Sequence, residues 1–411
     1  MQQREQADFN PIAAMQMRSY STEGDGLFTD GRVSNLPLDQ RIRVLNDSFA
    51  AFDTLIGDPL RDVVRQANRL EMPVEDVFSR MREGLLGEEW QAALDKYKAL
   101  NPRAQQIFHE IADRYVHAKQ QPRKFEAKLQ NGLSKFGGEI ADTYKGADGM
   151  AHQYIETVLN NDEAFQLLSP EDQETTKMKY RIATRIAAMN GNIQVFSDFD
   201  GTMTDGTAHI DMLPTRRLEE HLEVNDRDDF ALYSSTTAHA MMRYKDSRVL
   251  YEIGKEHVRF RKGVGHLVEN IQKYTGGRNL TILSANFEPV LLGGLENLPE
   301  ASGNLNYICI TPDSFLSERK DLVLQFFART NPKDALLMFA DGGSDEISLE
   351  AQDNIAGYFA LKDKGFAKKC KARGVAYVTY EDFSEIEGHI DDIMSIVPQM
   401  KRYLNRQTSV V

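Results

Sequence analysis

The sequence of 411 residues has few cysteines, no long apolar run and fewer basic than acidic residues. Cys309 and Cys370 show no metal-ligand spacing, which argues against a disulfide scaffold or a zinc site and favours a reducing compartment, the cytoplasm. No stretch approaches the ~20 apolar residues of a membrane span. The 62 acidic and 49 basic residues give a net charge of −13, which repels nucleic-acid phosphates and anionic lipids. We therefore expect a globular protein that binds neither nucleic acid nor membrane.

The first half of the chain changes from a polar beginning to a helical pattern. Residues 1–35 show no sustained apolar period, and we expect them to be mobile. Apolar residues then recur at spacings of three and four, which predicts an all-helical domain over residues 36–190. Asn101-Pro102 and Ser169-Pro170 each place a capping side chain before a proline, the pattern of a helix start. Asn190-Gly191 favours a left-handed backbone and predicts the end of the last helix.

After residue 191, short apolar runs alternate with helical stretches. The runs cover residues 193–197, 280–283, 307–310, 336–340 and 357–361. This alternation is typical of a parallel sheet flanked by helices, so we predict a doubly wound α/β core for residues 191–411, folding separately from the helical half. The gap between the first two runs is too long for one crossover helix. We expect an inserted helical cap over about residues 205–261.

Acidic residues follow the first and fourth of these runs. The first run leads into DFDGTMT (Asp198 to Thr204), and the fourth leads into DGGSD (Asp341 to Asp345). Asp198 and Asp200 are two residues apart, so an extended chain places both on one side. In an open parallel sheet, the loops at the carboxyl ends of the strands form the ligand crevice. One carboxylate can attack an electrophile while its neighbour transfers a proton, although Asp-Gly-Thr alone is equally typical of a turn.

Two further residues stand in order between the acidic motifs. Ser284 follows the second apolar run, and Lys320 opens an amphipathic helix before the fourth run. Lys333 is the alternative lysine, but it lies in an Asn-Pro-Lys turn that we expect to be solvated. The ordered set Asp-x-Asp, Ser, Lys and Asp-Gly-x-Ser-Asp resembles the haloacid dehalogenase (HAD) superfamily of phosphotransferases over about residues 193–386.

Two stretches make the resemblance more specific. Phe260 to Val264 and Gly357 to Lys364 resemble the phosphoserine phosphatase group of that superfamily. The second stretch, followed by Tyr377 to Phe383, is most similar to the methylthiopentenyl phosphate phosphatases. Thr207 stands where phosphoserine phosphatases have a glutamate that reads the substrate's amine, so phosphoserine itself is not the expected substrate.

The resemblance implies a role for each acidic residue. Asp198 would be the nucleophile that forms an aspartyl phosphate. Asp200 would protonate the leaving oxygen and then activate water. A Mg²⁺ ion would be held by Asp198, Asp341 and the backbone carbonyl of Asp200, with Asp345 steadying these ligands. A hard cation with oxygen ligands is what a carboxylate nucleophile needs in order to approach a phosphate dianion.

The resemblance also assigns Thr202, Ser284 and Lys320 to phosphate binding. The expected function is therefore Mg²⁺-dependent hydrolysis of a phosphate monoester, with a small phosphorylated metabolite as substrate. An alternative is a protein phosphatase, or a delivered regulatory protein, whose residues 36–190 dock on a protein partner. A catalytically silent scaffold is the third reading, and the complete set of motifs disfavours it.

Overall fold

The computed structural model describes residues 18–19, 58–206, 247–298, 300, 303–311, 316–362 and 364–408. Of residues 1–35, which we expect to be mobile, only Arg18 and Ser19 are described, so that expectation lies outside these ranges. Most of the predicted cap lies outside them as well. Within the described residues, no helix is both long enough and apolar enough to cross a membrane. Cys309 and Cys370 are buried, and neither forms a disulfide bond.

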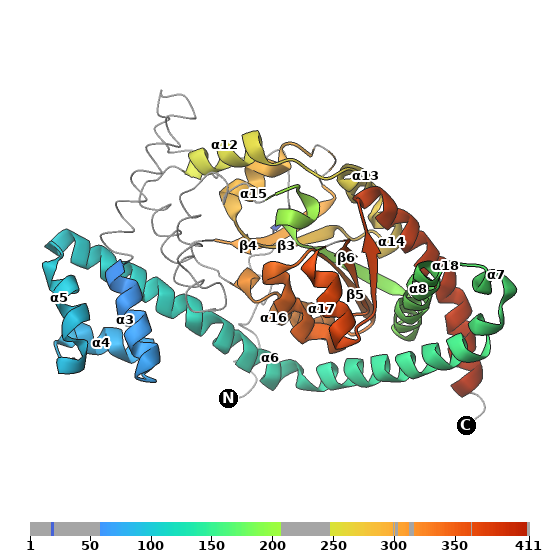
Figure 1. The fold of residues 1–411 in the computed structure, drawn as a ribbon, viewed down its shortest axis with the longest axis horizontal. Helices are drawn as coiled ribbons and strands as arrows, with labels where there is room; N and C mark the ends of the chain where they lie inside the picture. Colours follow the sequence, from blue (N-terminus) through green and yellow to red (C-terminus); the bar gives the residue numbers. More distant parts are fainter. Residues whose placement is uncertain are drawn as a thin grey trace, which may run out of the picture.

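The described part of the first half is helical, as predicted (Figure 1). Its segments are α3 (Asp58–Arg69), α4 (Val74–Glu83), η2 (Glu88–Trp90), α5 (Gln91–Ala99), α6 (Pro102–Thr157), η3 (Leu159–Asn161), α7 (Glu163–Gln166) and α8 (Pro170–Ala188). Both predicted starts are confirmed: the Asn101 side chain accepts from Ala104 N at 2.9 Å, and Ser169 Oγ accepts from Asp172 N at 3.1 Å. After α8, Asn190 and Gly191 have φ of 72° and 88°, which confirms the left-handed exit.

The second half is built on one sheet. Its strands are β2 (Asn192–Ser197), β3 (Leu280–Phe287), β4 (Leu305–Ile310), β5 (Asp334–Ala340), β6 (Gly357–Leu361) and β7 (Tyr377–Tyr380), with β1 (Arg18–Ser19) at one edge. The order is β1-β4-β3-β2-β5-β6-β7, and every pair is parallel except β1 with β4. All residues of β5 and β6 are buried, so both faces of the sheet are covered. The predicted α/β class is confirmed.

Helices connect and cover these strands. They are α12 (Ser247–His257), α13 (Val264–Asn270), α14 (Gln272–Thr275), α15 (Glu288–Leu295), η6 (Leu316–Glu318), α16 (Lys320–Thr330), η7 (Gly343–Asn354), α17 (Gly365–Arg373) and α18 (Phe383–Thr408), with the turn η4 (Phe199–Met203) after β2. From β2 the chain moves outward through β3 and β4 and then returns to β5 on the other side of β2. The carboxyl ends of β2 and β5 therefore flank the point where the strand order reverses, the usual position of a ligand crevice.

The buried apolar residues fall into two large clusters that do not divide at residue 190. One cluster lies within α3 to α6, from Leu60 to Tyr115, and contains Trp90. The other contains the sheet and also the second part of α6, beginning at Phe125. Phe125 packs on Phe326 of α16, with their ring centroids 5.7 Å apart. Figure 1 shows α6 running along the whole molecule, from the α3–α5 helices to α8.

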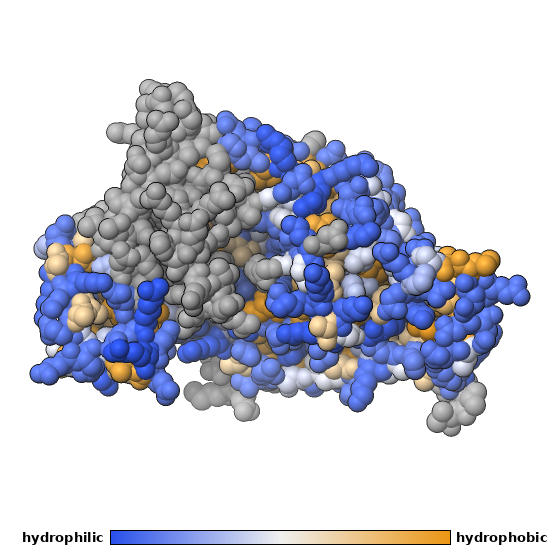
Figure 2. All heavy atoms as spheres, viewed as in Figure 1, coloured by the Kyte–Doolittle hydropathy of each residue, from blue (hydrophilic) through white to orange (hydrophobic). Residues whose placement is uncertain are grey.

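Hydrophilic side chains dominate the face shown in Figure 2. Among the described residues, the exposed large apolar side chains are Leu70, Leu85, Val158, Leu167 and Leu168. Leu167, which follows α7, is 88% exposed, whereas Phe125 in α6 is 5% exposed, so a substitution at Leu167 serves as the surface control for one at Phe125.

We predict that Phe125→Ala destabilises the sheet and not the α3–α5 helices. Removing a buried phenyl ring costs about 3 kcal/mol, whereas Leu167→Ala should change stability by less than about 0.5 kcal/mol. Trp90 is the only tryptophan in the sequence, so its fluorescence reports unfolding of the first cluster alone. Hydrogen exchange of the β2 and β5 peptides reports the second cluster. A shift of the Trp90 transition with unchanged exchange in β2 and β5 would favour a division at residue 190.

Candidate active site

The turn after β2 holds the first acidic motif. Asp198 is 5% exposed, and its backbone N–H donates to the carbonyl of Phe339 in β5 at 3.0 Å. Gly201 has φ of 75°, a left-handed conformation that favours glycine. A Cβ at this position would lie 2.6 Å from Oδ2 of Asp341, so glycine also lets the turn approach that carboxylate. The sequence DFDGT thus places a backbone turn directly against the second acidic motif.

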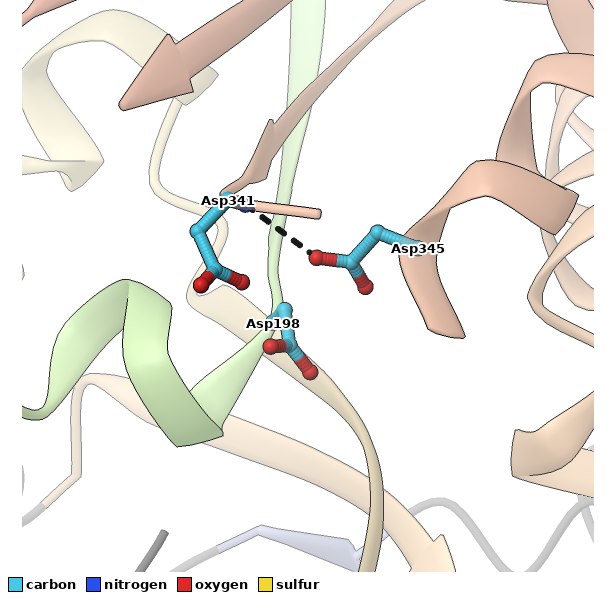
Figure 3. A group of neighbouring side chains, drawn as sticks. All are labelled: Asp198, Asp341 and Asp345. Carbon is cyan, nitrogen blue, oxygen red and sulfur yellow. Dashed lines mark hydrogen bonds between the residues drawn. The ribbon is translucent and has the colours of Figure 1, made fainter. Parts of the chain in front are cut away.

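The second acidic motif follows β5, the neighbour of β2. Ser197 of β2 pairs with Phe339 of β5, so Asp198 and Asp341 leave the sheet side by side. Asp345 lies in η7, and its Oδ2 accepts from the backbone N–H of Asp341 at 3.2 Å. Figure 3 shows the three carboxylates of Asp198, Asp341 and Asp345 gathered at this edge. Residues far apart in sequence therefore form one acidic cluster.

A buried lysine lies between two of these carboxylates. Lys320, the first residue of α16, is 1% exposed, and its Nζ donates to Oδ1 of Asp198 at 2.6 Å and to Oδ1 of Asp345. Burial disfavours the charge on Lys320, but the carboxylates of Asp198 and Asp345 outweigh it and raise the pKa of the lysine. Lys333, the alternative from the sequence, is exposed. Lys320 is the lysine that the fold brings to the acidic cluster.

The other predicted phosphate-binding residues carry hydroxyl groups. Thr202 Oγ1 lies 3.4 Å from Oδ2 of Asp198 and 3.2 Å from Oδ1 of Asp341, so it bridges the two motifs. Ser284 in β3 is buried, and its Oγ accepts from the backbone N–H of Asn286 at 3.0 Å. Because the Ser284 oxygen serves as the acceptor there, the Ser284 proton stays available to a ligand.

Asn286 is a site residue to which the sequence reasoning gave no role. Its side-chain Nδ2 donates to Oδ1 of Asp200 at 3.2 Å, and the residue is 1% exposed. The sequence indicates Asn286 only through its position two residues after Ser284, because the apolar run that predicts the strand ends at Leu283. The observed β3 continues to Phe287 after a shift in register, and this extension carries Asn286 to the acidic turn.

The carboxyl groups of the site have unusual proton affinities. Burial and the negative charge of Asp198 raise the pKa of Asp200 well above its usual range, against the opposing hydrogen bond from Asn286. The same two causes raise the pKa of Asp341, and they raise that of Asp345 to about 7. In each case the charged form is disfavoured because the carboxyl group is removed from water and lies near another negative charge. The site is therefore short of positive charge.

A Mg²⁺ ion fits this arrangement. Asp198, Asp341 and Asp345 each offer a carboxylate oxygen, and these oxygens lie within 4.8 Å of one another. Neighbouring oxygens on an octahedral Mg²⁺ ion lie about 3 Å apart, so these carboxylates would have to draw closer together around the ion. Oxygen-only donors and excess negative charge are what Mg²⁺ prefers. Asp198, Asp341 and Asp345 are thus the residues that could hold the ion, and a ligand role for the backbone carbonyl of Asp200 stays a prediction.

Two paired segments join this turn to the inserted residues. Thr204 forms an isolated antiparallel bridge with Phe260, and Arg261 donates from Nη2 to the carbonyl of Gly201 at 3.0 Å. The chain thus leaves and re-enters the core at adjacent points beside the acidic cluster. Thr207 and most of the predicted cap over 205–261 lie outside the described residues, which resume with α12.

Comparison with known proteins gives little beyond this geometry. No family model matches the chain, and no curated protein is found as a relative. Among solved structures, a crystal structure of cytosolic 5'-nucleotidase IIIB bound to cytidine aligns with a TM-score of 0.37 and 12% identity, over 60% of this chain and 98% of that chain. A similarity this low shows neither a family nor a function.

We predict that Mg²⁺ stabilises the protein through Asp341. A ligand at a hundred times its dissociation constant should add about 2.7 kcal/mol of stability, seen as a higher midpoint of thermal unfolding. Asp341→Asn should lose most of this gain because it removes a charged oxygen donor. Asp353→Asn is the matched control, since Asp353 is exposed in η7, the segment that follows Asp341. An equal Mg²⁺-dependent gain in Asp341→Asn and the control would place the ion elsewhere.

Proposed function

We propose that this protein hydrolyses phosphate monoesters with Mg²⁺, through a phosphoryl group carried transiently by Asp198. The observation that supports this most is the different bonding of two acids in one turn. Asp198 accepts from Lys320 and lies beside Thr202, partners that favour a charged nucleophile. The Asp200 carboxyl group instead accepts a hydrogen bond from the Asn286 side chain. Two acids with different surroundings suit a nucleophile and a proton donor.

The surrounding residues supply what phosphoryl transfer needs. Lys320 and the hydroxyls of Thr202 and Ser284 are donors for phosphoryl oxygens, and each comes from a different element. Bound Mg²⁺ would supply the positive charge that offsets repulsion between a phosphate dianion and the carboxylates. The motif order that resembles the HAD superfamily supports the same chemistry. The resemblance to the phosphoserine phosphatase group and the methylthiopentenyl phosphate phosphatases favours a small phosphorylated metabolite as substrate.

A second candidate function is hydrolysis of a macromolecular phosphate ester. It is favoured by the position of α6, whose Ala118 packs against Phe287 and Ile310 at the carboxyl ends of β3 and β4. The α3–α5 helices, with a core of their own, are thereby joined to the side of the sheet that carries the site. In this version, the helical half docks on a phosphorylated protein partner while the same acids perform the reaction.

We predict that Asp198→Asn abolishes hydrolysis of p-nitrophenyl phosphate. An amide is a poor nucleophile, and the uncatalysed reaction is very slow, so the rate should fall by at least about 10³-fold. Turnover is measured with Mg²⁺ by release of p-nitrophenol. Asp353→Asn should keep turnover within about threefold, and circular dichroism confirms folding of both variants. A folded Asp198→Asn protein with wild-type turnover would remove Asp198 from the proposed role.

A further inference from the structure

Asn286 makes a set of hydrogen bonds that only a correctly oriented amide can make. Its Nδ2 donates to Oδ1 of Asp200 at 3.2 Å. Its Oδ1 accepts from the backbone N–H of Phe287 at 2.6 Å. An amide turned by 180° would place its NH₂ group against the Phe287 N–H, which cannot accept a hydrogen bond, so that bond would be lost. The backbone of β3 therefore decides which end of Asn286 faces Asp200.

The strand that holds Asn286 is firmly placed. Asn286 and Ser284 are both 1% exposed, and the Asn286 N–H donates to Ser284 Oγ at 3.0 Å. Phe287 pairs with Ile310 of β4, which anchors the extended end of β3. A buried amide with fixed bonds has one orientation available, so the contact with Asp200 is preorganised rather than made on demand.

We propose that Asn286 is the positioning residue that aims the Asp200 carboxyl group at the leaving oxygen of the substrate. This inference rests on the proposed function and adds a residue to it. Oδ1 of Asp200 is engaged by the amide, so Oδ2 is the oxygen left to exchange a proton with the substrate. Without the amide, the Asp200 side chain can rotate, and its proton no longer meets the leaving oxygen in one geometry.

The proposal has a definite place in the reaction. An Asp198 oxygen forms a bond to phosphorus while the bond from phosphorus to the ester oxygen breaks. That ester oxygen takes the proton of Asp200 and leaves as an alcohol, so Asp200 becomes a carboxylate. Water then attacks phosphorus, gives a proton to Asp200, and releases phosphate and the Asp198 carboxylate. Asn286 therefore affects the two proton transfers of Asp200, whereas Asp198 makes and breaks the bond to phosphorus.

Leaving-group dependence separates this role from a merely structural one. An alkyl alcohol is a poor leaving group and needs the proton, whereas p-nitrophenolate leaves without it. The value of kcat/KM reports events up to the first phosphoryl transfer, so it isolates the step in which Asp200 donates. General acid catalysis contributes about 10²- to 10⁴-fold to such steps.

The experiment compares kcat/KM for ethyl phosphate and p-nitrophenyl phosphate in Asn286→Leu, Asn286→Ala and the wild-type protein. We expect kcat/KM for the alkyl ester to fall by about 10²-fold in both variants, with the aryl ester within about threefold of wild type. Leucine has a similar size but no donor, and alanine removes the donor without adding bulk or charge. Asn279→Leu, just before β3, is the matched control and should change neither value by more than about threefold.

Three outcomes overturn the inference. An equal loss on both esters in a folded variant shows a structural role, and the proposed function then stands without Asn286. Unchanged values for both esters show that Asp200 needs no support from the amide. If the wild-type protein hydrolyses neither ester, the proposed function is rejected and the role of Asn286 is rejected with it. Thermal unfolding of each variant is measured alongside, and Asn286→Ala serves if Asn286→Leu does not fold.

Discussion

One buried ammonium group joins the elements that make the candidate active site. Lys320 of α16 is 1% exposed and donates hydrogen bonds to both Asp198, which follows β2, and Asp345 in η7. Removing one partner from such a buried pair typically costs about 3–5 kcal/mol, because the other charge is left without compensation. Asp200 and Asp341 add two more carboxyl groups nearby, so a single lysine cannot balance the cluster. Asp198, Asp341 and Asp345 could hold a divalent cation, which would offset this charge imbalance.

The sequence predicts the sheet and the order of its acidic motifs because both depend on short-range patterns. Apolar runs mark β2 to β6, and parallel strands bring their carboxyl ends to one edge. What sequence order cannot supply is register: Asp198 meets Asp341 because Ser197 pairs with Phe339. It also cannot supply the shift in β3 that carries Asn286 to Asp200, since a shift of this kind depends on pairing with β4.

The helical half departs further from what its pattern indicates, because long-range packing governs it. A proline inside a helix removes a backbone hydrogen bond and usually marks an end, yet α6, which is 56 residues long, continues through Pro122. Its second part is held by contacts such as Phe125 with Phe326, which no local spacing reveals. Strand β7 was missed for a related reason: with four residues, half of them only partly buried, its apolar run is too short to recognise.

A trapped phosphoenzyme would decide whether Asp198 forms a bond to phosphorus. Asp200→Asn should still accept a phosphoryl group from an aryl ester, which leaves without a proton, but its amide cannot take a proton from the attacking water. The aspartyl phosphate should then accumulate, and acid quenching followed by peptide mass spectrometry should find phosphate on Asp198. Phosphate on another residue, or rapid release of p-nitrophenol over many turnovers with no phosphorylated peptide, would contradict a covalent role for Asp198.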